Sequence, residues 1–242
     1  MIFFCVACFR PSRARKSTFG REGTNCFWCN ATSRDRAMLL NIHWAFLSKF
    51  VKNPKSPPKI IGISDGQLME KILKKMYQSR YQNYHYHQEP KLDITRVPST
   101  LFATTDIISC TEVLEHVAPP INLAFSGLKD LLKRNGTLVL SVPHSDSSGK
   151  HIEHFPEMTD SKLILDDTPR LVGTLKNEEH AEFTDLVFHG GIGFTLEYRV
   201  FSYHSLEQQL LESGFSELRL NRNHKLFGIW WENWSRVWIA VK

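Results

Sequence analysis

Residues 105–120 read TDIISCTEVLEHVAPP, and residues 131–145 read LLKRNGTLVLSVPHS. Each contains a short, mostly apolar run, Asp106–Cys110 in the first and Thr137–Val142 in the second, and each run ends in polar residues or proline. Such runs are typical of strands that are buried on both faces of a sheet. The intervening residues Ile121–Leu132 have the pattern of a helix, and a strand, a helix and a second strand in this order indicate a parallel sheet.

The alternation of strands and helices extends to both sides of these stretches. Upstream, Lys59–Ile63 is predicted to be a strand, and Gly66 opens a predicted helix over Gln67–Tyr77. The remaining predicted segments are strands at Tyr84–Tyr86 and Lys91–Ile94, a helix at Ser205–Ser213, and closing strands at Phe215–Leu220 and Arg236–Val241. The sequence therefore predicts an α/β fold with a mostly parallel sheet.

The two quoted stretches resemble the class I S-adenosylmethionine-dependent methyltransferases, in particular the broad group that carries "vLEHv" after the fourth strand. The resemblance covers about residues 59–143, and the final strands match more weakly. It implies a Rossmann-like sheet of seven strands whose last strand runs antiparallel. It also implies that S-adenosylmethionine lies over the ends of strands one, two and four.

The same resemblance implies a set of cofactor-binding residues. Gly66 matches the second glycine of the family's cofactor loop, Ser64 stands at the first, and Gly62 stands where an acidic residue is common. Asp65 supplies a carboxylate close to that position. The other implied contacts are Glu89 at the ribose hydroxyls, Asp93 near the adenine amino group, and Thr111 and Glu112 at the pocket floor.

Several of these residues have a structural interpretation as well. Gly66 could simply begin a helix, and Asp93 could be a turn residue at the end of a strand. Glu115 and His116 could brace the helix that follows the fourth strand. Because the first glycine is replaced by Ser64, a relative that keeps the fold without catalysis is also a hypothesis.

Two cysteine pairs open the chain, Cys5-x2-Cys8 and Cys26-x2-Cys29. Four thiolates at this spacing are typical of a structural zinc site, here a zinc knuckle. Disulfides and a redox site are the alternatives, and neither has a supporting context in the sequence. The fifth cysteine, Cys110, lies in an apolar run and is expected to be a small buried hydrophobe.

The chain is expected to divide into a zinc module at residues 1–32, a helix and linker at 33–58, and a methyltransferase domain at 59–242. The helix is predicted to start at a cap on Thr32 or Ser33 and to run to about Val51. Residues 144–200 are less regular, and we expect a loop-rich insertion there that covers a site.

Histidines are frequent in this predicted insertion. Methyl transfer from a sulfonium needs a general base only if the acceptor is protonated at neutral pH, and histidine suits that role. His154 or His189 is the candidate base, and Gly190, Gly191 and Gly193 suit a lid or a tight turn. A structural role or a second metal site are the alternatives, although no motif such as HExxH supports a metal.

Charge is concentrated near the start of the chain. Residues 1–56 carry ten Lys or Arg against Glu22 and Asp35, a net charge of +8, within a total of +5. This segment could contact RNA or another polyanion, or it could simply be a solvated face. The aromatic stretch 227–234 (FGIWWENW) could wall a pocket, form a subunit contact or pack on the sheet.

Three functional hypotheses follow. The preferred one is a methyltransferase for a small-molecule acceptor such as a sugar or another metabolite. The others are an RNA or protein methyltransferase recruited by the basic zinc module, and a non-catalytic binding protein. No apolar run reaches the roughly 18 residues that a membrane span needs, so no membrane partner is expected, and we expect a cytoplasmic protein.

Overall fold

The computed structural model describes residues 1–14, 22–145, 150–189, 195–230 and 236–242. Within them the central sheet has six strands in the order β14-β15-β6-β5-β3-β4. Strands β4, β3, β5 and β6 are parallel to one another, while β15 is antiparallel to both β6 and β14. The strands are β3 (Ile60–Ile63), β4 (Tyr81–Tyr84), β5 (Thr105–Thr111), β6 (Leu132–Ser141), β14 (Ser216–Leu220) and β15 (Val237–Val241).

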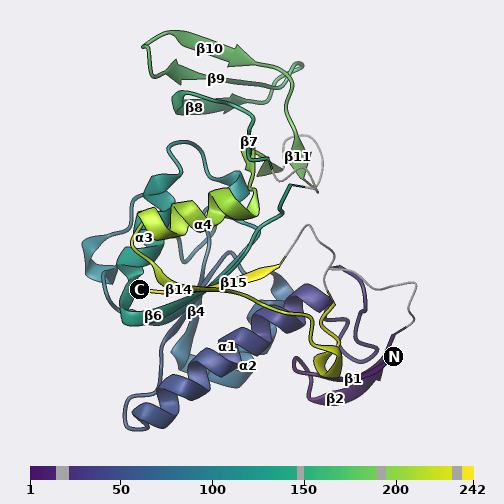
Figure 1. Ribbon diagram of the computed structural model, residues 1–242. Coiled ribbons are helices and arrows are strands. Elements are labelled where there is room, and N and C mark those ends of the chain that lie inside the picture. Colours follow the sequence, from purple (N-terminus) through teal and green to yellow (C-terminus); the bar gives the residue numbers. More distant parts are fainter. Residues whose placement is uncertain (15–21, 146–149, 190–194, 231–235) are drawn as a thin grey trace.

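Helices cover both faces of this sheet, as Figure 1 shows. On one face, α1 (Ser33–Lys52) and α2 (Gln67–Tyr77) pack on the strands, and on the other lie α3 (Asn122–Leu131) and α4 (Tyr203–Glu212). Side chains alternate across each strand, so neighbouring residues enter different cores. In β3, for example, Ile60 joins the α1 side and Ile61 the α3 side. The predicted α/β fold with helices on a mostly parallel sheet is therefore confirmed.

The third predicted strand, Lys91–Ile94, is wrong. The only pairing in that stretch is an isolated bridge between His85 and Lys91. Asp93 then accepts hydrogen bonds from the backbone N–H and the hydroxyl of Thr95, at 2.8 and 2.7 Å, which turns the chain away from the sheet. The described sheet therefore ends at β4, with six strands instead of the seven that the resemblance implied.

Other predicted elements differ at their ends. β4 starts three residues before the predicted Tyr84–Tyr86, and β6 starts at Leu132 instead of Thr137. The register of β6 against β5 shifts between Leu132 and Thr137, so the predicted turn at residues 134–136 forms an irregularity within the strand. Cys110 is fully buried in the core, as predicted.

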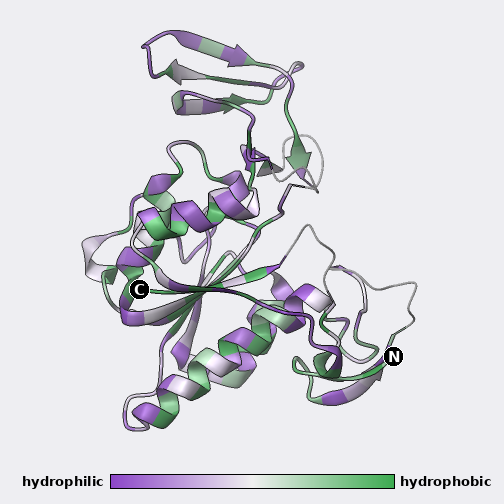
Figure 2. Cartoon of the chain, viewed as in Figure 1, coloured by the Kyte–Doolittle hydropathy of each residue, from purple (hydrophilic) through white to green (hydrophobic). Residues whose placement is uncertain are grey.

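The segment predicted as loop-rich contains short strands. Its outer part is a three-stranded antiparallel sheet of β8 (Met158–Ile164), β9 (Arg170–Leu175) and β10 (His180–Phe183). Its base has two ladders, β7 (Ile152–Glu153) with β13 (Arg199–Val200), and β11 (Phe188–His189) with β12 (Thr195–Leu196). Figure 2 shows the outer sheet as a mixture of hydrophilic and hydrophobic residues. Its apolar residues share a separate small core with the base, which includes Phe155 and Leu171.

The N-terminal module consists of the hairpin β1 (Ile2–Cys5) and β2 (Arg10–Arg13), followed by the loop that leads to α1. Thr32 caps α1 in a capping box with Asp35, as the predicted cap required. Fully buried Arg36 joins the module to a distant segment, because its guanidinium donates to the carbonyls of Thr24 and Gly228 at 2.8 and 2.6 Å. None of the helices in the described parts of the chain combines the length and apolarity that a membrane crossing needs.

Candidate functional site

A cavity of about 330 Å³ lies where β3 and β5 end and where α1 and α2 begin. The carboxyl edge of a parallel sheet is where ligands bind in folds of this class. Four predicted cofactor residues meet there: Ser64, Gly66, Thr111 and Glu112. The other lining residues are Arg34, Asp35, Gln67, Leu68 and Met69.

Two residues of this cleft have left-handed backbone conformations. Ser64, directly after β3, has φ 54°, and Glu112, directly after β5, also has φ 54°. Side chains other than glycine rarely adopt this region, and such strain is common at ligand sites. Ser64 stands at the first glycine position that the resemblance implied. Its backbone has a positive φ, a conformation that glycine adopts readily. Gly66 is the N-cap of α2, which has no side-chain cap, and a Cβ there would meet open space.

The resemblance had implied that Gly62 and Asp65 contact the cofactor. Neither is among the residues that line the cleft. The carboxylate of Asp65 is buried and accepts hydrogen bonds from Ser109 Oγ at 2.7 Å and Tyr81 Oη at 2.9 Å. Burial outweighs these bonds and raises the pKa of Asp65 to about 7. Asp65 thus anchors the loop between β3 and α2 to β4 and β5.

Glu89 and Asp93 are not among the residues that line the cleft. Glu89 is exposed and accepts a hydrogen bond from the backbone N–H of Lys91 at 3.2 Å. Asp93 forms the turn with Thr95 described above, which is the structural alternative that the sequence left open. Their contacts with ribose and adenine stay predictions.

The contribution of α1 to the cleft was not predicted. Arg34 forms ion pairs with Glu22 at 2.9 Å and with Glu112 at 3.3 Å, so it connects the N-terminal module to the end of β5. Glu112 also accepts a hydrogen bond from Ser141 Oγ at 2.8 Å. The predicted cap at Thr32 was the available signal, because it fixes where the first turn of α1 starts.

The four predicted metal ligands come together in the N-terminal module. The sulfurs of Cys5 and Cys29 are 3.7 Å apart, as are those of Cys8 and Cys26. A tetrahedral ion with Zn–S bonds of about 2.3 Å places its sulfurs about 3.8 Å apart, so the donor set fits zinc. In the described residues, this is the one group of three or more potential ligands whose donor atoms lie within 4.8 Å of one another.

The surroundings of the cysteines also suit a cation. Burial raises the pKa of Cys5, so the protein alone does not favour its thiolate. At Cys26 burial acts in the same direction, but hydrogen bonds from Ser12 and two backbone N–H groups prevail and lower the pKa to about 6. A bound metal would stabilise all four thiolates.

The two candidate bases are joined by one carboxylate. His154 Nε2 lies 2.9 Å from Glu197 Oε1, and His189 Nε2 lies 2.8 Å from Glu197 Oε2. Both histidines were predicted as candidate bases within the insertion, and Glu197 was not predicted. Glu197 lies between β12 and β13, far from His154 in the sequence, so no local pattern indicated the contact.

The base of the insertion is fixed to the segment after β5. Fully buried Arg199 makes two 3.0 Å contacts with Glu153 and donates to the carbonyl of Leu114 at 2.9 Å. His116 Nδ1 lies 2.8 Å from the carbonyl of Leu196. The LEH residues, which form the turn η4 (Leu114–His116), therefore brace the insertion.

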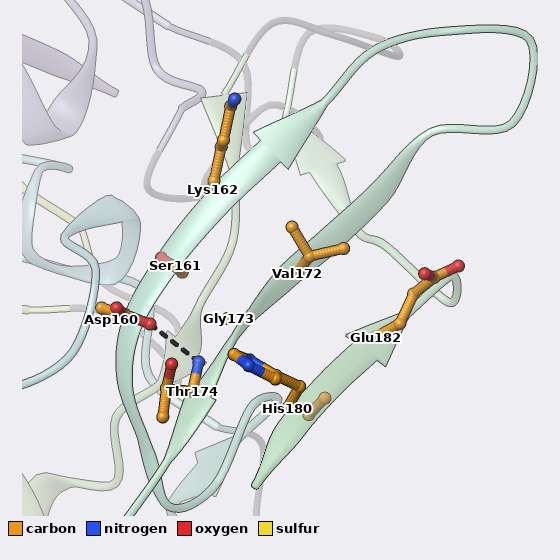
Figure 3. A pocket seen from close by; sticks show the side chains of 9 residues that line it. Asp160, Ser161, Lys162, Val172, Gly173, Thr174, His180 and Glu182 are labelled. Atoms are coloured by element: carbon orange, nitrogen blue, oxygen red, sulfur yellow. Dashed lines mark hydrogen bonds between the residues drawn. The ribbon is translucent and has the colours of Figure 1, made fainter. Parts of the chain in front are cut away.

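A larger, open hollow of about 460 Å³ lies on the outer sheet of the insertion. Figure 3 shows its lining, which includes Lys162, Val172, His180 and Glu182, and a hydrogen bond from the backbone N–H of Thr174 to Asp160. None of the predicted site residues lines it. Size alone therefore does not locate the candidate site. The predicted glycines at 190, 191 and 193 lie outside the described residues.

Comparisons with known proteins agree with this architecture. The CMeT domain of the citrinin polyketide synthase is similar over 88% of this chain and 52% of that chain, with 14% identity and a TM-score of 0.50. A Burkholderia thailandensis 1,6-didemethyltoxoflavin-N1-methyltransferase, solved with S-adenosylhomocysteine, is similar over 85% and 78% of the two chains, with 14% identity and a TM-score of 0.46. At such identities the likeness concerns the fold alone.

A methyltransferase from Archaeoglobus fulgidus is similar over 84% of this chain and 94% of that chain, with 12% identity and a TM-score of 0.45. No curated protein matches the chain significantly. The family described as "Methyltransferase domain" matches residues 28–219, well over half of the sequence and including all strands that border the cleft. This chain therefore belongs to the methyltransferase domain family.

Proposed function

We propose that the protein is an S-adenosylmethionine-dependent methyltransferase for a small-molecule acceptor. The observation that carries this proposal is the cleft at the ends of β3 and β5, where Ser64, Gly66, Thr111 and Glu112 meet. Membership of the methyltransferase domain family supports the reaction type. The resemblance in the quoted stretches supports the donor.

The residues of the cleft suit a cofactor that carries both charge and hydroxyl groups. Gly66 leaves the first backbone N–H groups of α2 without a side-chain cap, and such groups bind carboxylates well. Glu112 offers carboxylate oxygens that can accept from hydroxyls. The cofactor supplies an electrophilic methyl group, and the protein's part is to hold donor and acceptor in line.

Zinc is the metal that we assign to Cys5, Cys8, Cys26 and Cys29. Four thiolates occupy all four coordination positions of a tetrahedral zinc ion. The site would therefore be structural, with no open position for chemistry. The ion would hold together the module from which α1 starts, and Arg34 of α1 reaches the cleft.

A small acceptor is favoured because the candidate bases belong to an insertion with its own core. Such an insertion can enclose a small molecule. A second candidate is an RNA or protein acceptor bound by the N-terminal module, and one observation favours it. Phe27 and Trp28 are exposed there, and the guanidinium of Arg10 lies 5.3 Å from the centre of the Trp28 ring. Exposed aromatic and cationic groups together can stack on bases.

Titration calorimetry with S-adenosylhomocysteine tests the donor. The wild type should bind, and Gly66→Arg should abolish binding because its side chain would fill the cleft. Thr168→Arg, on the exposed surface of the insertion, is the matched control and should bind normally. Failure of the folded wild type to bind would remove the enzyme hypotheses and leave a non-catalytic relative.

A further test separates the two acceptor classes. Binding of single-stranded RNA that falls with salt and is lost in Phe27→Ala with Trp28→Ala would favour the macromolecular acceptor. Trp44→Ala, an exposed tryptophan on α1, is the matched control. A small-molecule enzyme should show no such binding.

A further inference from the structure

Glu197 holds two imidazoles at once. Its carboxylate is mostly buried, with a side-chain exposure of 10%, and each oxygen faces the Nε2 atom of one histidine. The three groups come from different short segments: Glu197 follows β12, His189 ends β11, and His154 follows β7. The fold of the insertion therefore brings three separate segments together at one mostly buried carboxylate.

The hydrogen-bonding pattern determines where the protons lie. An ionised carboxylate only accepts, so the Nε2 atoms of neutral His154 and His189 must both carry hydrogen. Their Nδ1 atoms are then unprotonated and can accept a proton. Within the described residues, neither Nδ1 has a hydrogen-bond partner.

The group also contacts the segment that follows the cleft residue Glu112. The rings of His116 and His189 are in edge-to-face contact with centroids 4.9 Å apart. His116 follows the cleft residue Glu112 by four positions, so their Cα atoms are at most about 14 Å apart. His189 therefore contacts the short segment that continues from the cleft.

His189 is the better placed of the two imidazoles. Its side chain is 43% exposed, against 24% for His154. The backbone N–H of His154 also donates to the carbonyl of Tyr198 at 2.9 Å, and its ring packs near Phe155. His154 is therefore the more fixed partner, and His189 is the one that an acceptor can approach.

We propose that Glu197 and His154 are positioning residues that orient His189 as the proton acceptor for a hydroxyl-bearing substrate. This proposal rests on the methyltransferase function proposed above. In the reaction the hydroxyl oxygen attacks the methyl carbon, a C–O bond forms, and the C–S bond breaks with its electron pair going to sulfur. The hydroxyl proton goes to His189 Nδ1, so charge and atoms balance.

The arrangement can be tested without a substrate. Nitrogen NMR of the full-length protein with labelled histidine reports the tautomer of each ring, and His154→Asn and His189→Asn assign the signals. We expect both wild-type rings as Nε2–H tautomers. In Glu197→Gln the amide offers one acceptor and one donor, so one ring should change to the Nδ1–H tautomer. Glu182→Gln, an exposed carboxylate of the same insertion, should change neither.

Two NMR outcomes would overturn the assignment. One is a wild type in which either ring is an Nδ1–H tautomer. The other is a Glu197→Gln variant in which both rings stay as Nε2–H tautomers, because Glu197 would then not determine their orientation.

The chemical role is tested with S-adenosylmethionine labelled in its methyl group and the small-molecule fraction of an extract of the source cells. The product should keep its label in alkali, as a methyl ether does and a methyl ester does not. Glu197→Gln should slow transfer by about 100-fold, the usual size of a general-base effect, without changing the affinity for S-adenosylhomocysteine. Glu182→Gln should transfer at the wild-type rate.

Alkali-labile product, or full activity in Glu197→Gln, would overturn the proposed role. So would a wild type that transfers no label. The binding measurement made in parallel then distinguishes the two failures. If S-adenosylhomocysteine still binds, the base assignment alone fails, and if it does not, the proposed function fails with it.

Discussion

The carboxylate of Asp65 occupies the space that a side chain at Gly62 would fill. A Cβ at position 62 would lie 2.4 Å from Asp65 Oδ2, and it would also lie 2.6 Å from Tyr81 Oη. The resemblance expects an acidic residue at position 62. Gly62 has no side chain there, and the carboxylate of Asp65 takes up that space instead.

This relationship predicts a large difference between two glycine variants. Gly62→Ala should lower the free energy of unfolding by about 2 kcal/mol or more, because the methyl group overlaps a buried polar cluster. Gly66→Ala should change it little, since its Cβ meets open space. Urea unfolding of both variants is the measurement, and equal effects would show that the close approach at Gly62 is not important.

The buried Asp65 predicts a stability that falls as pH rises. Its pKa is raised from 3.8 to about 7, so between these values the folded protein holds a proton that the unfolded chain has lost. Stability from this group is full below about pH 4 and declines towards pH 7, by up to about 4 kcal/mol at 1.36 kcal/mol per pKa unit. Asp65→Asn should flatten this slope in urea unfolding between pH 4.5 and 8, and Asp167→Asn should not.

The left-handed backbone of Ser64 predicts opposite effects of two substitutions. Ser64→Val should lower the free energy of unfolding by about 1–3 kcal/mol, because a β-branched residue is strained at positive φ. Ser64→Gly removes the strain and should be neutral or slightly stabilising. Thermal unfolding measures both, and the glycine variant should still bind S-adenosylhomocysteine.

Removal of the metal should affect the distant cleft. Metal analysis should find one zinc per chain, and a chelator or Cys5→Ser should lower the melting temperature by on the order of 5 °C or more. Affinity for S-adenosylhomocysteine should fall too, because Arg34 reaches the cleft from the helix that the module anchors. Cys110→Ser serves as the control that leaves the metal content unchanged. A metal-free protein of full stability would contradict the zinc assignment.

Much of the fold could be predicted because strong local signals agreed with the tertiary structure. The boundaries of α2 coincide with the predicted Gln67–Tyr77, where Gly66 marks the start. The strand at Lys91–Ile94 failed because Asp93 offers its neighbours a turn, a choice that the apolar pattern does not reveal. Strands β8 to β10 were missed because their residues alternate only weakly between polar and apolar types.

The site was predictable to the extent that it follows the chain. Ser64 and Gly66 come soon after β3, and Thr111 and Glu112 lie at the end of β5, so they meet at one sheet edge. Contacts between distant segments were not predictable. Glu197 lies 43 residues from His154, and no local pattern marks them as partners. The aromatic residues 231–234 lie outside the described part of the chain.

The place of β15 has a consequence for how the protein is made. This strand lies inside the sheet, between β6 and β14. The segment before it supplies the carbonyl of Gly228, which accepts a hydrogen bond from Arg36. During synthesis β15 must therefore have left the ribosome before the sheet can close. Until then β6 presents an unpaired apolar edge, which is the point at which a chaperone would be needed most.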